Sequence, residues 1–174
     1  QAIDQWFPRY MQEHHNIDLK SASFQVLAFM MPFVASAGSL ISGYISDTMF
    51  KGRRAPVAAG LFFLESVVIF CAAIMIPAAT RLGWDSGTTA IVFLLLISLT
   101  ANSTHSILGT AAAMDIGGRK MAGFASGLIN SFQYFGGSLA GYFLGKLLDK
   151  NWDYYFYFMI PFGILGGLLM LAIK

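Results

Sequence analysis

Five long stretches of this sequence are almost free of charge, and they constrain its fold more than any other feature. Four of them contain no Asp, Glu, Lys or Arg: Ser21–Ser46, Ser86–Met114, Met121–Gly145 and Tyr154–Ile173. The fifth, Ala55–Thr80, is interrupted only by Glu65. A helix needs roughly 20 apolar residues to cross a hydrocarbon core about 30 Å thick. The sequence therefore predicts five transmembrane helices, at about 22–46, 55–80, 87–112, 121–145 and 154–173.

The composition and local patterning support an all-α membrane protein over the other classes. Charged residues make up 11% of the chain, whereas soluble domains carry about 25%. Strands of a membrane barrel are about 10 residues long and alternate in polarity, but Ile91–Ile97 and Tyr154–Ile160 are apolar without alternation. The single cysteine, Cys71, provides neither a disulfide framework nor a cysteine-based metal site.

The spans and their connections suggest how the chain is arranged across the bilayer. Gln1–Met11 has the mixed aromatic and polar character of a helix leaving a membrane, and we interpret it as the end of a helix that begins upstream. Consecutive connections must lie on opposite faces, so Asp47–Arg54 and Asp115–Lys120 share one side. Arg81–Asp85 and Lys146–Asp153 share the other. The basic residues divide six to five between the sides, which makes charge a weak guide to orientation.

Polar side chains within the predicted spans are candidates for a solute pathway, because each must find a partner away from lipid. Asn102 and His105 lie three residues apart, and Asn130, Gln133 and Tyr134 share a helix face at i, i+3 and i+4. We expect the two faces to line a polar cavity, with hydrogen bonding between helices as the alternative. Gln25 is a further candidate for this cavity.

Glu65 is the acidic residue placed deepest in a predicted span. It follows Arg54 by 11 residues, which corresponds to a depth of about 16 Å along a helix. An ionised carboxylate there would be costly, so we expect Glu65 to be protonated or paired. A structural hydrogen bond to another helix is favoured, and a role in proton coupling is the alternative.

The sequence contains no recognisable constellation for catalysis. It lacks a phosphate-binding glycine loop, a metal-ligand pair of His and Glu, and a nucleophile elbow. We therefore expect neither an enzyme nor a metal or organic cofactor, and the short basic loops give no reason to expect nucleic acid as a partner.

Three motifs resemble the major facilitator superfamily. The first runs through Gly43, Asp47, Gly52, Arg53 and Arg54, the loop signature in which an Asp at a helix end pairs with Arg across a short cytoplasmic turn. Its spacing, Phe50-Lys-Gly-Arg-Arg-Ala-Pro56, resembles the organophosphate:phosphate antiporter family. The second motif contains Asp115, Arg119 and Lys120, and the third is Trp6-x-Pro8-x-Tyr10.

The resemblance implies the C-terminal six-helix half of a twelve-helix transporter, covering the end of helix seven and helices eight to twelve. Its partners would be the N-terminal six-helix half and the lipid bilayer of the cell (inner) membrane, where it is multi-pass. Helices eight, ten and eleven would line the substrate cavity, and helices nine and twelve would lie outside, which lowers the expectation for Glu65. The family's phosphate-binding arginines lie upstream of Gln1.

The function implied is exchange of an organic phosphate (sugar phosphate, glycerol phosphate or phosphoglycerate) for inorganic phosphate by alternating access. Two alternatives remain open within the same fold. One is proton-coupled transport of another small solute through Glu65 and His105, and the other is a transport-inactive receptor for sugar phosphate. The sequence does not identify the substrate, because Asn102–His105 departs from the family's helix-ten pattern.

Overall fold

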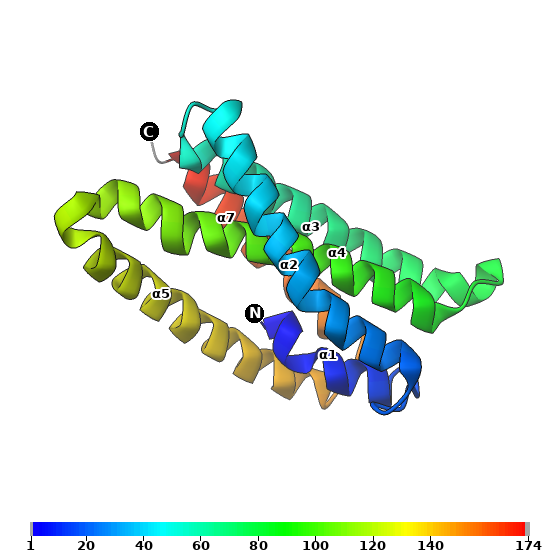
Figure 1. Ribbon diagram of the computed structural model, residues 1–174. Coiled ribbons are helices and arrows are strands. Elements are labelled where there is room, and N and C mark those ends of the chain that lie inside the picture. Colours follow the sequence, from blue (N-terminus) through cyan, green and yellow to red (C-terminus); the bar gives the residue numbers. More distant parts are fainter. Residues whose placement is uncertain (1, 173–174) are drawn as a thin grey trace.

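A computed structural model describes residues 2–172, with Ala2, Thr80 and Arg119 described by their backbone alone, and the described residues form helices without any strand (Figure 1). In chain order the elements are α1 (Ala2–Glu13), α2 (Ala22–Thr48), α3 (Arg54–Ala79), η1 (Thr80–Leu82), α4 (Ser86–Ser106), η2 (Ile107–Ala112), α5 (Ala113–Leu148), α6 (Tyr154–Tyr157) and α7 (Ile160–Ala172). The element η2 is a π-helical turn that continues α4.

Within the described chain, 4 helical stretches are long and apolar enough to cross a membrane. They are Ala22–Thr48, Arg54–Ala79, Ser86–Gly118 and Tyr154–Ala172. The predicted span 121–145 lies within α5, whose many Gly and Ser residues, together with Asn130 and Gln133, reduce its hydropathy. Its crossing of the membrane therefore stays a prediction.

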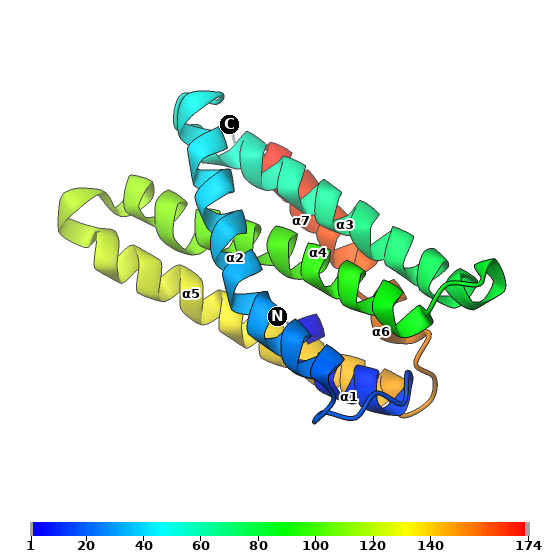
Figure 2. The ribbon, with the colours of Figure 1, turned by 45° about the vertical axis from the view of Figure 1, so that its right-hand side comes forward.

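Helices α2 and α3 pack against α4, and α7 packs against α3. In both ribbon views α2 crosses α4, while α3 lies beside α4 and α7 (Figures 1 and 2). The approach of α2 to α4 is close at Gly38, where an added Cβ atom would lie 2.5 Å from the carbonyl oxygen of Leu99. A small residue is thus required where these two apolar helices pack.

The connections between helices gather at two opposite ends of the molecule. The α2–α3 and α4–α5 turns lie at one end, and the α1–α2, α3–α4 and α5–α6 connections lie at the other (Figures 1 and 2). This is the alternation expected of consecutive membrane spans.

The turn between α4 and α5 is shorter than the predicted connection Asp115–Lys120. Helix extends to both sides of Gly118, and Gly118 itself has non-helical backbone angles, a φ of 57° and a ψ of −170°. A Cβ atom on Gly117 would lie 2.9 Å from the Cα atom of Ala122. Two consecutive glycines therefore allow the chain to reverse within about one residue.

A cluster of aromatic side chains fixes α1 at the end where it meets the α5–α6 connection. Tyr10 stacks on Tyr155 with 4.4 Å between ring centroids, and the Tyr155 hydroxyl donates to the carbonyl of Ile3 at 2.8 Å. The Arg9 guanidinium lies 5.4 Å from the Trp6 ring centroid and 5.6 Å from that of Trp152. Aromatic residues at the ends of the predicted spans indicated an interfacial region. Which rings pair with each other depends on the tertiary fold.

Candidate functional site

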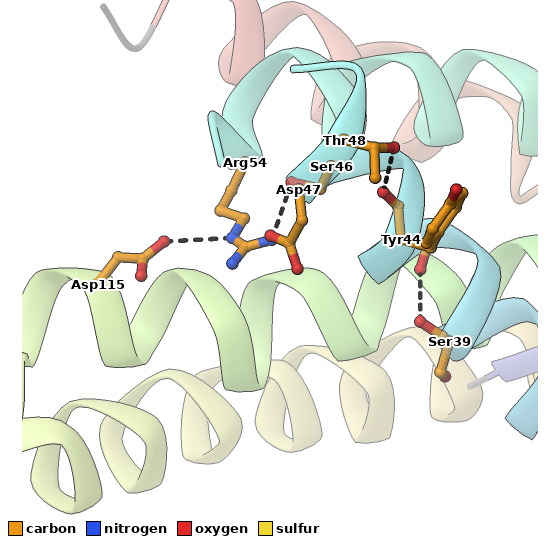
Figure 3. A network of polar contacts seen from close by, with 8 residues as sticks. Ser39, Tyr44, Ser46, Asp47, Thr48, Arg54 and Asp115 are labelled. Atoms are coloured by element: carbon orange, nitrogen blue, oxygen red, sulfur yellow. Dashed lines mark hydrogen bonds and ion pairs between the residues drawn. The ribbon is translucent and has the colours of Figure 1, made fainter. Parts of the chain in front are cut away.

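The loop signature forms a connected set of polar contacts centred on Arg54, the first residue of α3 (Figure 3). Its Nη1 donates to Asp47 Oδ1 at 2.6 Å and to Ser46 Oγ at 2.9 Å. Its Nε donates at 3.2 Å to Asp115 Oδ2, which lies near the end of the helix Ser86–Gly118 that continues α4, before the reversal at Gly118. One guanidinium thus joins the end of α2, the start of α3 and the end of the Ser86–Gly118 helix.

The backbone of the α2–α3 turn brings Arg54 back toward α2. Lys51 and Gly52 both adopt positive φ values, 52° and 78°, and the Gly52 amide donates to the carbonyl of Ser46 at 2.9 Å. These left-handed residues reverse the chain soon after the helix ends at Thr48. The side chain of Arg54 then lies beside Asp47.

The electrostatics of this set favour a latch between helices. The Arg54 side chain is 19% exposed, and those of Asp47 and Asp115 are 62% and 56% exposed. The pair with Asp47 was expected from the sequence. The pair with Asp115, 61 residues away, was not, because it depends on how the Ser86–Gly118 helix packs. A shift of the end of this helix against α2 and α3 would break the second pair and leave the first intact.

The other signature residues lie around this set without joining it. A Cβ atom on Gly43 would have no described atom within 4 Å, and Arg53 and Lys120 are exposed. The prediction for the side chain of Arg119 lies outside the described part of the chain.

A cavity of about 580 Å³ lies between α3, α4, α5 and α7. Its wall is mostly apolar, with Phe62, Phe143, Phe158 and Phe162 among its residues. Four side chains able to form hydrogen bonds also line it: Glu65, Thr104, His105 and Gln133. A largely apolar pocket with a few polar groups is typical of small-molecule sites.

His105, near the end of α4, and Tyr134 of α5 lie close to each other. Their ring centroids lie 5.8 Å apart at an interplanar angle of 66°, an edge-to-face arrangement. His105 is half-buried, whereas Tyr134 is 59% exposed. The pair therefore connects the cavity wall to the outer face of α5.

The amides of Asn130 and Gln133 meet the π-helical turn η2 at Gly109. A Cβ atom on Gly109 would lie 2.9 Å from Gln133 Oε1 and closer still to Asn130 Oδ1, while Ser126 Oγ donates to the Gly109 carbonyl at 2.7 Å. Among the described side chains, Gln133 Oε1 is a buried oxygen without a hydrogen-bond partner. Single π-helical turns occur frequently at functional sites.

Four of the six predicted cavity residues do not line this cavity: Gln25, Asn102, Asn130 and Tyr134. Asn102 is half-buried and donates to the carbonyl of Ser98 at 2.9 Å, and its own carbonyl accepts from Ser39 of α2 at 3.5 Å. Gln25 is exposed in the first turn of α2 and donates to the carbonyl of Lys20 at 3.1 Å. Both amides therefore make local contacts in this structure, whereas Glu65, expected on an outer helix, lines the cavity.

These features define a multi-pass α-helical membrane protein whose described residues include no group of three or more His, Cys, Asp or Glu side chains able to hold a metal ion. Residues 1–141 match the Major Facilitator Superfamily. The chain belongs to this superfamily of transporters, and its predicted all-α membrane fold, as one half of such a protein, is confirmed.

Three relatives illustrate the similarity. The chain is 29% identical over 171 residues to the "Probable hexose phosphate transport protein" of Chlamydia trachomatis serovar D, covering 98% of this chain and 36% of the relative. It is 29% identical over 172 residues to the membrane sensor protein UhpC of Escherichia coli K12, covering 98% and 37%. It is 30% identical over 168 residues to the glycerol-3-phosphate transporter of Bacillus subtilis 168, covering 95% and 35%. The chain thus spans about a third of these relatives, and no solved structure matches it.

Proposed function

We propose that this chain is the C-terminal half of a secondary transporter that exchanges an organic phosphate for inorganic phosphate across the cell (inner) membrane. The observation that carries the proposal is the Arg54 latch, because it joins three helices at one end and has one pair that a helix movement can break. The names of the relatives, which include hexose phosphate and glycerol-3-phosphate transporters, support the substrate class.

The mechanism would be alternating access, in which two halves rock against each other around a central site. The N-terminal half would be the partner, and the cytoplasmic ends of the helices would carry the Arg54 latch. Breaking the contact with Asp115 while Asp47 stays paired would let the end of the Ser86–Gly118 helix move relative to α2 and α3 at a small cost, since exposed ion pairs are worth about 0–1 kcal/mol.

The test is reconstitution of the full-length protein in liposomes loaded with inorganic phosphate. Uptake of labelled glucose 6-phosphate or glycerol 3-phosphate is expected to require internal phosphate and to continue when the pH gradient is abolished. Uptake that ignores internal phosphate would refute exchange. Binding of sugar phosphate without any exchange would favour a receptor, and one relative is named a membrane sensor protein.

Proton-coupled transport of another small solute is the second candidate function. Glu65 and His105 line the same cavity, and ionisable residues at membrane depth are often part of proton pathways. Uptake driven by an imposed pH gradient in liposomes without phosphate would favour this candidate.

A further inference from the structure

A groove lies between α2 and α3, with α4 beneath it, near the end of the molecule that contains the Arg54 latch. Its volume is about 290 Å³, and residues of all three helices and of the α2–α3 turn line it. On α4 the groove is lined by Leu99 and Ser103, whereas Ala101 and His105 line the cavity next to α5. The groove is therefore a separate feature on another face of α4.

The wall of the groove suits hydrocarbon better than a polar solute. Its described lining residues carry no charge, and two of them, Ile41 and Leu64, are exposed. The three hydroxyl groups in the wall, those of Ser42, Thr100 and Ser103, donate to backbone carbonyls of their own helices at 3.1, 3.1 and 2.6 Å. Because these donors are already satisfied, a polar solute would gain few hydrogen bonds here. An acyl chain would make dispersion contacts with the apolar wall without such a loss.

The net charge of the helix connections differs between the two ends of the molecule. The connections near the groove (47–54 and 115–120) contain five basic and two acidic residues, whereas those at the other end (9–20, 81–85 and 146–153) contain five of each. The groove therefore lies at the end with an excess of positive charge. Anionic lipids attract basic residues that lie next to membrane spans. A phospholipid with a negatively charged headgroup is thus favoured at this end over a zwitterionic one.

Lys51 and Arg53 place part of this positive charge beside the groove. Both are exposed in the α2–α3 turn, and the nearby residues Phe50 and Pro56 line the groove. The ion pairs in the described part of the chain involve neither Lys51 nor Arg53, whereas Arg54 is paired with carboxylates. Two cations are therefore available to a headgroup next to an apolar groove.

We infer that this groove binds an anionic phospholipid, with an acyl chain along the groove and the headgroup phosphate beside Lys51 and Arg53. The helices have the length and apolarity to cross a bilayer, so phospholipid is the molecule that surrounds their outer faces. A free phosphate ion would use the same two cations but would leave the apolar wall uncovered, so the groove favours a lipid. The inference is independent of the solute that the protein transports.

The experiment uses the full-length protein in vesicles that contain equal amounts of anionic phosphatidylglycerol and zwitterionic phosphatidylcholine. The photoreactive residue benzoylphenylalanine replaces Ile41 in the groove, and each lipid is radiolabelled in turn. We expect crosslinking to phosphatidylglycerol to exceed crosslinking to phosphatidylcholine about tenfold. Ile74 is the matched probe position, because it is exposed on the same face of α3 as Gly60 and lies outside the groove. At Ile74 the ratio of the two lipids should be near one.

Two pairs of variants separate the contributions of the cations and of the groove. The combination of Lys51→Gln and Arg53→Gln should bring the ratio at position 41 close to one. Lys20→Gln combined with Lys150→Gln removes the same charge at the opposite end and should leave the ratio unchanged.

Gly60→Leu tests the groove itself, because an added Cβ atom on Gly60 would have no described atom within 4 Å. A leucine therefore fits and takes the space of the acyl chain, and the ratio at position 41 should fall severalfold. Gly43→Leu is the control, since Gly43 has the same open space and does not line the groove.

Each result is a ratio of two lipids on one protein variant, so incomplete folding of a variant does not obscure it. Equal crosslinking of the two lipids at position 41 would overturn the inference, as would a ratio that survives the loss of Lys51 and Arg53 or the filling of the groove by Gly60→Leu. Crosslinking of position 41 mainly to another part of the full-length protein, or to a second copy, would show that protein covers the groove and would also overturn the inference.

Discussion

Arg54 stabilises the structure through the geometry of its guanidinium as much as through its charge. It donates to oxygens of Ser46, Asp47 and Asp115, which come from two helices other than its own. Ser46 is fully buried, so loss of its donor is not readily compensated by water. A lysine at this position would keep the charge and lose the fork that reaches three acceptors.

We therefore expect Arg54→Lys to destabilise the full-length protein by about 1 kcal/mol and to slow exchange. The reason is that one ammonium group cannot replace contacts to both Asp47 and Asp115. Thermal unfolding in detergent and initial rates in proteoliposomes measure the two effects. Arg53→Lys is the matched control, since Arg53 is adjacent and exposed. Equal effects of both variants would contradict the importance of this geometry.

His15 makes the stability of the opposite end of the molecule depend on pH. Its Nε2 lies 3.0 Å from the Tyr10 hydroxyl and its Nδ1 lies 3.4 Å from Ser86 Oγ. Burial, aided by His14, lowers the pKa of His15 to about 4, against the opposing effect of Asp85. Burial also lowers the pKa of His14, although Asp153 opposes it. The folded state thus keeps these imidazoles neutral at pH values where the unfolded chain binds protons.

The sign of the pH effect follows from this depressed pKa. The contribution of neutral His15 to stability is fully present above about pH 6.5, the ordinary pKa of His, and is lost as the pH falls toward 4. The loss for the half-buried His15 should be on the order of 1–2 kcal/mol after allowance for solvent screening. We expect His15→Gln to reduce the fall of the thermal midpoint between pH 7 and pH 4.5. An unchanged pH dependence in this variant would refute the assignment.

At the scale of helices and their connections, the sequence predicted the regular parts better than the contacts between them. The charge-free stretches locate α2, α3 and α4 within a few residues, because a bilayer requires long apolar helices. The single-residue turn at Gly118, the π-helical turn η2 and the stacking of Tyr10 on Tyr155 were not predicted. Each depends on how distant segments pack, and a local pattern of polarity contains little information about that packing.

The candidate site shows the same division between local and tertiary information. The Asp47–Arg54 pair follows from a seven-residue spacing, whereas the pair with Asp115 requires the position of the Ser86–Gly118 helix. Helical spacing places Asn102 on the face of His105, and its side-chain amide donates to the Ser98 carbonyl of its own helix; its part in a substrate cavity stays a prediction. Glu65 was judged peripheral, yet α3 presents it to the cavity.

The α4–α5 turn supplies a prediction at this scale. Gly118 has a φ of 57° and a ψ of −170°, a backbone region that is essentially restricted to glycine and costs other residues about 1–3 kcal/mol. We expect Gly118→Ala to lower the thermal midpoint of the full-length protein, and Gly117→Ala to lower it further, since the added Cβ atom would meet the backbone of Ala122. Gly43→Ala is the control, because its Cβ atom would have no described atom within 4 Å. A loss of stability in Gly43→Ala equal to that in Gly118→Ala would contradict this explanation.

At the scale of the whole molecule, the two ends differ in chemistry as well as position. One end contains the Arg54 latch and the tight turn at Gly118, and the other contains the aromatic cluster around Tyr10. The first end joins helices through partly exposed ion pairs, which break at little cost. The second end joins its helices through buried rings and a buried hydroxyl, and these contacts are more costly to break. Movement between helices is therefore expected at the first end, with the second end as the fixed point.

The proposed function, with the Arg54 latch on the cytoplasmic side, predicts a definite topology, in which the turns at Lys51 and Lys120 face the cytoplasm and those at Lys20 and Lys150 face the outside. All four lysines are exposed. The sequence contains one cysteine, Cys71, and Cys71→Ser removes it so that only the introduced cysteine reacts. In the full-length protein, with any remaining cysteines replaced, we expect Lys20→Cys and Lys150→Cys to react with a membrane-impermeant maleimide applied to intact cells or spheroplasts. Lys51→Cys and Lys120→Cys should react only after the membrane is permeabilised, because α2 to α5 place them at the opposite end.

Labelling of Lys51→Cys and Lys150→Cys from the same side would contradict the alternation of spans, including the crossing predicted for 121–145. Reversed labelling of all four would keep the alternation and place the Arg54 latch outside, where it could not act as a cytoplasmic gate.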